Sequence, residues 1–186
     1  MRRRDFLGLL SGGPLAAALA RHAMAAAPTG STSIAEIQQT WTELLAPGAG
    51  VATSTARLDK SDEEWRRLLT PAQYDVLRRE GTERPFTSSL NNEKRPGVFA
   101  CAGCALPLFT SRMKYDSGTG WPSFFTLIPD RLATKEDFKL IVPRTEYHCV
   151  RCGGHQGHVF DDGPPPTGLR YCNNGVALRF IPQKSA

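Results

Sequence analysis

The sequence predicts a mainly β protein in which short helices precede an antiparallel β domain. Glycine and proline together make up about a sixth of the 186 residues, which favours turns and short strands over long helices. Helical periodicity of apolar residues ends before Pro85, and short apolar or alternating runs bounded by glycine and proline replace it. A hydrophobic content of 40% in a chain of this length is enough to build one core.

Residues 1–27 have the features of an export signal. Three arginines at positions 2–4 are followed by an apolar stretch at 6–19 and by a small-residue cleavage site at 23–25. Residues 3–7 (RRDFL) resemble the twin-arginine motif of bacteria, a route that carries folded proteins. We expect export by this route to the periplasm or the cell exterior. An ordinary secretory signal and an uncleaved anchor are the alternatives.

The rest of the chain is close to neutral. Of the formal net charge of +5, the first 25 residues supply four arginines and one aspartate, which leaves 19 basic and 17 acidic residues. This balance argues against nucleic acid as a partner. No apolar run reaches the roughly 18 residues that a membrane helix needs, so no stable membrane span is expected after signal cleavage.

Residues 28–60 form a low-charge extension rich in alanine, threonine, serine and glycine. One helix is expected inside it, because Ser33 and Glu36 can form a capping box and apolar residues follow on one face as far as Leu45. Pro47 then ends the helix. The alternative is a mostly disordered spacer.

The domain proper is expected at residues 61–183. Ser61 and Glu64 form a capping box for a first helix. The apolar face of this helix consists of Trp65, Leu68 and Leu69. A second helix begins with Pro71 at its first position, and Gly81 is its expected C-terminal cap.

Eight short strands are expected after the helices, and their order along the chain predicts an antiparallel β domain. The predicted strands are Val98–Cys101, Leu106–Phe109, Ser123–Thr126, Phe138–Val142, Glu146–Cys149, Val159–Phe160, Leu169–Asn173 and Ala177–Ile181.

Four of the five cysteines form two C-x-x-C pairs, Cys101 with Cys104 and Cys149 with Cys152. Each such turn places two sulfur atoms on one side, and two turns can close a tetrahedral four-sulfur site. Zn²⁺ is the expected ion, one per chain. Four thiolates fill its coordination shell, so the site would be structural and not catalytic.

Three other interpretations of these cysteines remain open. Two disulfides would suit an oxidising destination, iron in the same geometry would give a small electron carrier, and a zinc ribbon would bind nucleic acid. The near-neutral charge disfavours the ribbon. The fifth cysteine is unexplained by a simple disulfide framework or by a simple electron carrier.

That fifth cysteine, Cys172, is a candidate nucleophile. Arg170 lies two residues before it and, on a strand, points to the same side. A neighbouring cation lowers the pKa of a thiol and raises its thiolate fraction. A buried, inert thiol is the alternative.

Two histidines and a tryptophan complete the candidate site. His155 and His158 closely follow the second C-x-x-C pair and could supply protons near pH 7, although an ordinary loop or zinc ligation would also explain them. Residues 161–164 are most simply a turn, whose carboxylates could orient a histidine or an arginine. Trp121, between a glycine and a proline, is either one wall of an apolar pocket or a core aromatic.

Several motifs in this order resemble the methionine-R-sulfoxide reductase B family. They lie at residues 118–124 (GTGWPSF), 149–164 (CVRCGGHQGHVFDDGP) and 169–174 (LRYCNN), with a similar lead-in at 69–86. The resemblance covers about Trp65 to Pro182. It implies two small antiparallel sheets preceded by helices, a structural zinc site made by the four paired cysteines, and reduction of methionine-R-sulfoxide in oxidised proteins.

The resemblance also implies a role for each site residue. Cys172 is the implied nucleophile, and it would become a sulfenic acid. The residues expected to orient and protonate the sulfoxide oxygen are His155, His158 and Asn174. The residues expected to line or support the substrate pocket are Trp121, Phe160, Asp162 and Arg170.

The sequence departs from the family pattern at two positions. Thr119 stands where many members have a resolving cysteine, so an external thiol, either thioredoxin-like or of low molecular weight, is expected to reduce the sulfenic acid directly. A zinc thiolate that swings in is the alternative, at a cost in metal affinity. Asn173 stands where the family usually has an apolar residue. A monomer is expected, and the main rival function is a zinc- or iron-binding module without enzymatic activity.

Overall fold

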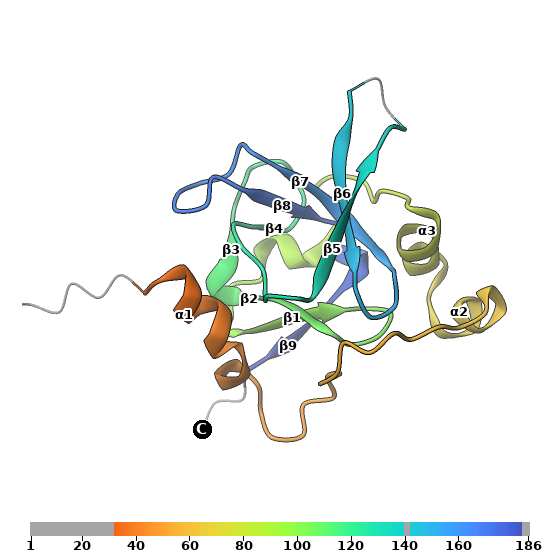
Figure 1. Ribbon diagram of the computed structural model, residues 1–186, viewed down its shortest axis with the longest axis horizontal. Helices are drawn as coiled ribbons and strands as arrows, with labels where there is room; N and C mark the ends of the chain where they lie inside the picture. Colours follow the sequence, from red (N-terminus) through yellow and green to blue (C-terminus); the bar gives the residue numbers. More distant parts are fainter. Residues whose placement is uncertain (1–31, 140–141, 184–186) are drawn as a thin grey trace, which may run out of the picture. The chain divides into compact units, whose positions relative to one another are not determined.

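The computed structural model describes residues 32–139 and 142–183, which form two antiparallel sheets preceded by short helices (Figure 1). The predicted fold class is therefore confirmed. The expected export signal at residues 1–27 lies outside the described residues. Within the described ranges, no helix is both long and apolar enough to cross a membrane.

The smaller sheet has three strands and the larger has six. In the smaller sheet, β1 (Gly97–Cys101) lies between β2 (Pro107–Thr110) and β9 (Leu178–Pro182). The larger sheet has the order β3-β4-β8-β7-β6-β5. Its strands are β3 (Lys114–Tyr115), β4 (Ser123–Phe124), β5 (Leu132–Asp137), β6 (Arg144–Cys149), β7 (His155–Phe160) and β8 (Arg170–Asn173).

The predicted strand Phe138–Val142 is wrong at residues 138, 139 and 142, which are not in a strand, and residues 140–141 lie outside the described residues. The strand in this region is β5, which ends at Asp137 and pairs with β6. Phe138 is 67% exposed and Val142 is 70% exposed, so these apolar side chains do not face the core. Strand β5 is an edge strand with a mostly polar sequence, which gives little hydrophobic periodicity. Strand β7 also begins earlier than predicted, at His155, so both histidines of the candidate site lie on a strand.

The two helices before the sheets are confirmed with their N-terminal caps. Helix α2 (Asp62–Leu68) begins at the Ser61 capping box, and α3 (Pro71–Arg79) has proline in its first turn. Two details differ from the prediction. Leu68 is 60% exposed instead of facing the core, and Glu80, in the left-handed conformation, ends α3 in place of Gly81.

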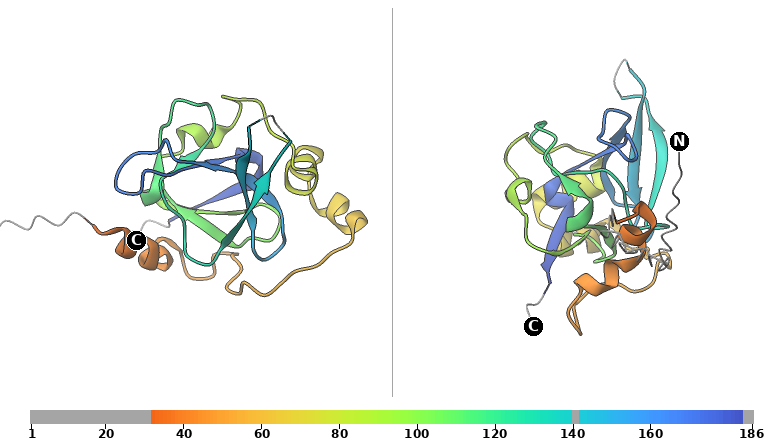
Figure 2. Two further views of the ribbon diagram at one scale, coloured as in Figure 1. Left: turned by 45° about the horizontal axis from the view of Figure 1, so that its top comes forward. Right: turned by 90° about the vertical axis from the view of Figure 1, so that its left-hand side faces the viewer.

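The extension contains the predicted helix and then follows the surface of the domain. Helix α1 (Ile34–Gln39) continues into the 3-10 helix η1 (Thr40–Leu44), whose Leu44 is buried. Residues 46–60 then run from η1 to α2 below the sheets, in orange and yellow in Figures 1 and 2. Three further 3-10 helices are η2 (Ser89–Asn92), η3 (Ser111–Met113) and η4 (Gly175–Ala177).

Aromatic side chains join the two sheets into one core. Phe109 of β2 stacks on Phe124 of β4, with ring centroids 4.1 Å apart. Tyr147 of β6 and Tyr171 of β8 pack edge to face at 5.5 Å. Burial of such rings is a main source of stability and fixes the larger sheet against the smaller one. The opposite face of the larger sheet carries the candidate site.

Candidate active site and metal centre

Strand register places the candidate residues in one row across the larger sheet. His158 of β7 pairs directly with Cys172 of β8 and, on its other side, with Glu146 of β6. Cys172 pairs in turn with Ser123 of β4. Side chains of directly opposed residues lie on the same face of a sheet, with Cβ atoms roughly 5 Å apart. The histidine and the thiol are therefore neighbours because of backbone pairing.

A small pocket of about 110 Å³ opens above this row. Its wall combines aromatic rings, polar groups and the cysteine. The lining residues are Thr82, Trp121, Arg144, Gly157, His158, Phe160, Cys172 and Asn174. A pocket of this size fits the end of one side chain. It has an apolar wall, a thiol and hydrogen-bonding groups in one place.

Opposing influences act on the thiol of Cys172. Burial raises its pKa, whereas the charge of Arg170 and hydrogen bonds from Thr119 and Arg170 lower it. The net shift is upward. The cation predicted from the sequence is thus present on the same face of the strand, but burial outweighs it, and Cys172 is a thiol at neutral pH.

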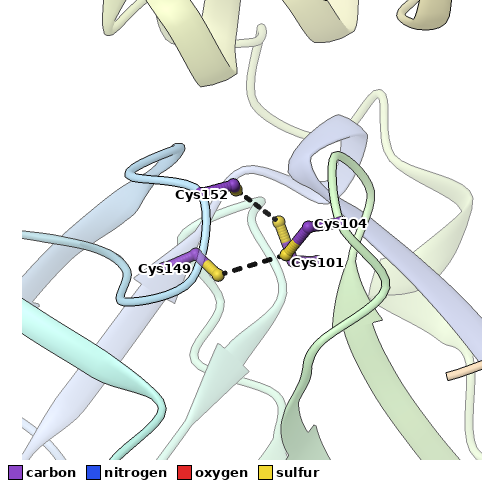
Figure 3. A group of neighbouring side chains, drawn as sticks. All are labelled: Cys101, Cys104, Cys149 and Cys152. Carbon is purple, nitrogen blue, oxygen red and sulfur yellow. Dashed lines mark hydrogen bonds between the residues drawn. The ribbon is translucent and has the colours of Figure 1, made fainter. Parts of the chain in front are cut away.

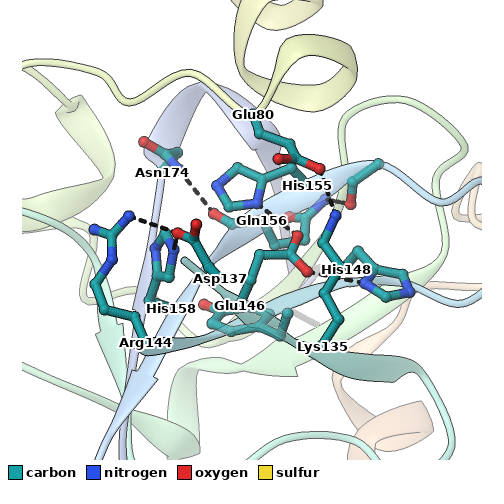
Figure 4. A network of polar contacts seen from close by, with 12 residues as sticks. Glu80, Lys135, Asp137, Arg144, Glu146, His148, His155, Gln156, His158 and Asn174 are labelled. Carbon is teal, nitrogen blue, oxygen red and sulfur yellow. Dashed lines mark hydrogen bonds and ion pairs between the residues drawn. The ribbon is translucent and has the colours of Figure 1, made fainter. Parts of the chain in front are cut away.

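Asp137 fixes the orientation of His158. The Nε2 atom of His158 lies 2.7 Å from Asp137 Oδ2, and Arg144 Nη2 donates to the same oxygen at 2.6 Å (Figure 4). Hydrogen bonds from Lys139 N, His158 and Arg144 hold the pKa of Asp137 well below its usual range. Burial lowers the pKa of His158, and the carboxylate partly opposes this shift. His158 is therefore neutral at pH 7: its Nε2–H donates to Asp137 Oδ2, and its Nδ1 carries no proton.

His155 lies behind the pocket wall instead of in it. Its Nδ1 is 2.6 Å from Glu146 Oε1, and its ring packs against that of His158 with centroids 5.4 Å apart (Figure 4). Burial would raise the pKa of Glu146, but hydrogen bonds from His148 and His155 lower it to about 2. His155 Nε2 is buried and has no hydrogen-bond partner in the described part of the chain.

The amide of Asn174 is held in one orientation. Its Oδ1 accepts a hydrogen bond from Glu83 N at 3.0 Å, and its Nδ2 donates to Gln156 O at 3.0 Å. These two bonds settle which end of the amide is oxygen and which is nitrogen. One N–H of Nδ2 remains for a ligand in the pocket. Trp121 Nε1 donates to Glu83 O at 3.1 Å, so one segment supports both residues.

Arg170 and Asp162 form a two-pronged ion pair beside the pocket. Arg170 Nε and Nη2 donate to the two carboxylate oxygens of Asp162 at 2.8 Å each. The guanidinium group also lies over the ring of Phe160, 4.3 Å from its centroid. This arrangement fixes an aromatic wall of the pocket and a positive charge near Cys172.

The four remaining cysteines converge as the spacing predicted. Their sulfur atoms lie within 4.8 Å of one another, with Cys101 Sγ 3.7 Å from Cys152 Sγ and Cys104 Sγ 3.5 Å from Cys149 Sγ (Figure 3). Zn–S bonds of about 2.3 Å in a tetrahedron place sulfur atoms about 3.8 Å apart, whereas a disulfide needs about 2.05 Å. The donor set and spacing therefore fit a structural metal site, and zinc is typical of such thiolate sites. None of the five cysteines is in a disulfide.

Comparison with known proteins identifies the family. A family model, the SelR domain, matches residues 69–182. A protein of Methanosarcina barkeri called peptide methionine sulfoxide reductase MsrB is 55% identical over 124 residues, which are 66% of this chain and 87% of the relative. The chain belongs to the MsrB family. Proteins with the same name from Pseudomonas putida and Leifsonia xyli are 53% and 54% identical, over 70% and 68% of this chain and 98% and 93% of their own lengths.

The structure gathers most of the residues predicted for the site. Those that line the pocket of this MsrB-family protein are Trp121, His158, Phe160, Cys172 and Asn174. Asp162 and Arg170 support it from the side, and His155 from behind. Sequence reasoning missed Glu83, Asp137, Arg144 and Glu146. Glu146 carried a weak signal, since alternation places it on the same strand face as His148, but its partner His155 follows only from the pairing of β6 with β7.

Proposed function

We propose that the protein reduces the R epimer of methionine sulfoxide in oxidised polypeptides, with Cys172 as the nucleophile. Membership of the MsrB family makes it a peptide methionine sulfoxide reductase, an oxidoreductase that acts on oxidised proteins and uses a thiol reductant. The observation that carries the assignment of Cys172 is its place in the pocket wall, between aromatic rings and two hydrogen-bonding side chains.

The pocket offers apolar contacts for the S-methyl group of the substrate and polar contacts for its sulfoxide oxygen. The rings of Trp121 and Phe160 suit the S-methyl group, because they offer apolar contact area. His158 and Asn174 both line this space, and the Nδ1 and the second Nδ2 N–H that their other hydrogen bonds leave free suit the oxygen. A chiral sulfur bound in this way presents one epimer to Cys172 with its oxygen on the polar side.

The resting site holds its proton on the thiol. Burial raises the pKa of Cys172 and lowers that of His158, so the pair is neutral at pH 7. The substrate oxygen needs a proton before it can leave sulfur. We assign this proton to the thiol, which passes it through His158 Nδ1 to the oxygen as the sulfur atom of Cys172 attacks.

The reduction step needs no other group. The thiol and the sulfoxide give methionine and a Cys172 sulfenic acid, so the sulfoxide sulfur gains two electrons and the cysteine sulfur loses two. An external thiol next attacks the sulfenic sulfur, releasing water and forming a mixed disulfide. A second thiol of the reductant then attacks the mixed disulfide, which releases the Cys172 thiol and forms the disulfide of the reductant.

Recycling depends on an external thiol because Thr119 occupies the position expected for a resolving cysteine. The side chain of Thr119 hydrogen-bonds the Cys172 thiol, so a cysteine at position 119 would be within reach of it. The other four cysteines form the metal site, and moving one of them to Cys172 would weaken the metal. The reductant attacks through the mouth of the pocket.

The metal has a structural role in this proposal. Cys101, Cys104, Cys149 and Cys152 would hold Zn²⁺, which supplies cross-linking between two turns and no step of the reaction. Strand β7 begins three residues after Cys152, so the metal fixes the start of the strand that carries both histidines.

The export route belongs to the proposal as well. The arginine pair and apolar stretch within residues 1–27 support export by the twin-arginine pathway to the periplasm or beyond, with residues 28–60 as an extension and 61–183 as the catalytic domain. A monomer suffices for every role assigned above. Signal-peptide dependence is tested by replacing Arg3 and Arg4 with lysine and locating the protein by cell fractionation.

Turnover of the two separated epimers of a blocked methionine sulfoxide, with dithiothreitol as reductant, tests the central proposal. Consumption of the R epimer alone, lost in Cys172→Ser, is the expected result. A zinc-loaded protein that turns over neither epimer would favour the rival, a metal-binding module. In that case the Cys172→Ser variant would fold and bind metal like the wild type, because the rival gives Cys172 no role.

A further inference from the structure

Glu83 connects two pocket residues that come from distant parts of the chain. Its carbonyl oxygen accepts from Trp121 Nε1 at 3.1 Å, and its N–H donates to Asn174 Oδ1 at 3.0 Å. Thr82, the residue before it, lines the pocket. The main chain of Glu83 therefore holds the indole of Trp121 on one side and the side-chain amide of Asn174 on the other.

The carboxylate of Glu83 holds the segment that follows Asn174. Its Oε1 accepts from Gly175 N at 2.5 Å and its Oε2 accepts from Val176 N at 3.0 Å. A carboxylate with two backbone donors forms charge-assisted bonds, which are shorter and stronger than neutral ones. Little space is left, because a Cβ at Gly175 would lie 1.9 Å from Ser88 Oγ. The turn after β8 is thus fixed at three consecutive residues.

We propose that Glu83 is a positioning residue for the reduction step, acting through Asn174. This inference rests on the proposed function. The N–H of Glu83 orients the Asn174 amide. The carboxylate of Glu83 fixes the position of the backbone that follows Asn174. Because Glu83 does not line the pocket, its side chain has no contact with substrate and affects only where the Asn174 N–H points.

Glu83→Gln tests this role with almost no change in size. One of the two backbone N–H groups then faces an NH₂ donor, while the carbonyl bond to Trp121 is kept. The single-turnover rate for the R epimer is expected to fall by about 10-fold or more, since small displacements of positioned groups have effects of this order. KM and the alkylation rate of Cys172 are expected to change less than about 2-fold.

Glu64→Gln is the matched control, because Glu64 also accepts a backbone N–H, that of Ser61, at the start of a distant helix. Similar losses of melting temperature in both variants, with a slower reduction step in Glu83→Gln alone, support positioning. An unchanged single-turnover rate in Glu83→Gln overturns the proposal. A fall in rate accompanied by an equal rise in KM overturns it as well, because binding would then be weakened in general. A wild-type protein without epimer turnover contradicts the proposed function itself.

A second inference rests on the extension, whose residues 52–58 lie across both cysteine turns. Ala52 N donates to Ala105 O at 2.9 Å, directly after Cys104. Leu58 N donates to Arg151 O at 2.7 Å, inside the other C-x-x-C turn. Arg151 Nη1 returns a bond to Ser54 O at 2.7 Å.

These contacts restrain the backbone on which the metal depends. A thiolate-bound metal leaves when one of its ligand turns opens, and each turn here is bonded to the same crossing segment. Ala52 and Leu58 also pack against the hydrophobic core. The segment lies outside residues 69–182 that match the SelR domain.

We infer that residues 52–58 are a strap that slows metal loss from the four cysteines. The strap ties the Cys104 turn to the Cys149–Cys152 turn on the outside of the site, so both must detach before either opens fully. Its effect is on the rate of release and not on which atoms bind the metal.

The double variant Ala52→Pro and Leu58→Pro removes both N–H donors and no metal ligand. Zinc release into excess chelator, followed by absorbance, is expected to be at least about 10-fold faster, with one zinc per chain before the challenge. Ala56→Pro is the matched control, since Ala56 N bonds Ser54 Oγ within the strap and should change the rate less than 2-fold. Arg151→Met, which loses the bond to Ser54 O alone, should fall between them. A release rate equal to that of the wild type in the double variant overturns the strap.

Discussion

His158 and Cys172 face each other directly across β7 and β8. Backbone pairing sets this relationship, so it does not depend on the length or flexibility of either side chain. It brings a partly buried imidazole, whose pKa is lowered, next to a partly buried thiol, whose pKa is raised. Both groups are therefore neutral at pH 7, as the proposed transfer of the thiol proton through His158 to the substrate oxygen requires.

The first prediction concerns the pH dependence of Cys172 reactivity. Its alkylation by iodoacetamide should have a midpoint above the value of about 8.5 for a free cysteine, because burial raises its pKa. Arg170→Met should move the midpoint higher still, since a positive charge is lost while Asp162 remains. Mass spectrometry localises the label, and Arg112→Met is the control, because Arg112 pairs with Thr40 and Glu43 and does not line the pocket. A midpoint below 8 would contradict the dominance of burial.

The second prediction concerns Glu146, which holds His155 from behind. Glu146→Gln keeps the shape but removes the charge, so we expect the single-turnover rate to fall by about 10-fold or more through misplacement of His155 and of His158, which packs edge to face against it. The variant isolates the carboxylate because Glu146 is buried and does not touch the pocket. A rate within 2-fold of the wild type would show that His155 needs no anionic partner.

Glu146 also predicts a pH dependence of stability. Its pKa of about 2 in the folded protein lies below the ordinary value of about 4.3, so its ionised form stabilises the fold above that ordinary value. This contribution is lost as pH falls from about 5 towards 2. The difference in unfolding free energy between wild type and Glu146→Gln, measured with urea, should shrink as the pH falls from about 5 towards 2. A difference that does not vary with pH would contradict it.

The third prediction concerns the metal centre. One zinc per chain and five thiols after denaturation with a chelator are expected, because the four sulfur atoms are too far apart for disulfides. Iron would colour the protein, and disulfides would leave one free thiol. Cys149→Ser should lose the metal and lower the melting temperature by at least about 10 °C, since three of the four ligands are core residues. Thiol titration and metal analysis separate these outcomes.

The sequence predicts those parts of the site that depend on local spacing. Capping boxes, the C-x-x-C turns and the alternation of Arg170 with Cys172 need only neighbouring residues. The anchoring of His158 by Asp137 could not be predicted in this way, because it depends on the pairing of strands across two hairpins. Strand β5, which carries Asp137, is a polar edge strand, and its exposed neighbours Phe138 and Val142 gave a stronger but misleading signal.

The last prediction concerns recycling. The Thr119 side chain bonds the Cys172 thiol, so a cysteine in its place has its sulfur close enough to attack a sulfenic acid there. With one equivalent of R epimer and no reductant, the wild type should yield one methionine and a Cys172 sulfenic acid that dimedone traps. Thr119→Cys should yield the same methionine and an internal disulfide, with no dimedone adduct. Mass spectrometry distinguishes the adduct from the loss of two hydrogens. An internal disulfide in the wild type, made with a cysteine of the metal site and accompanied by zinc release, would show instead that the metal centre takes part in recycling.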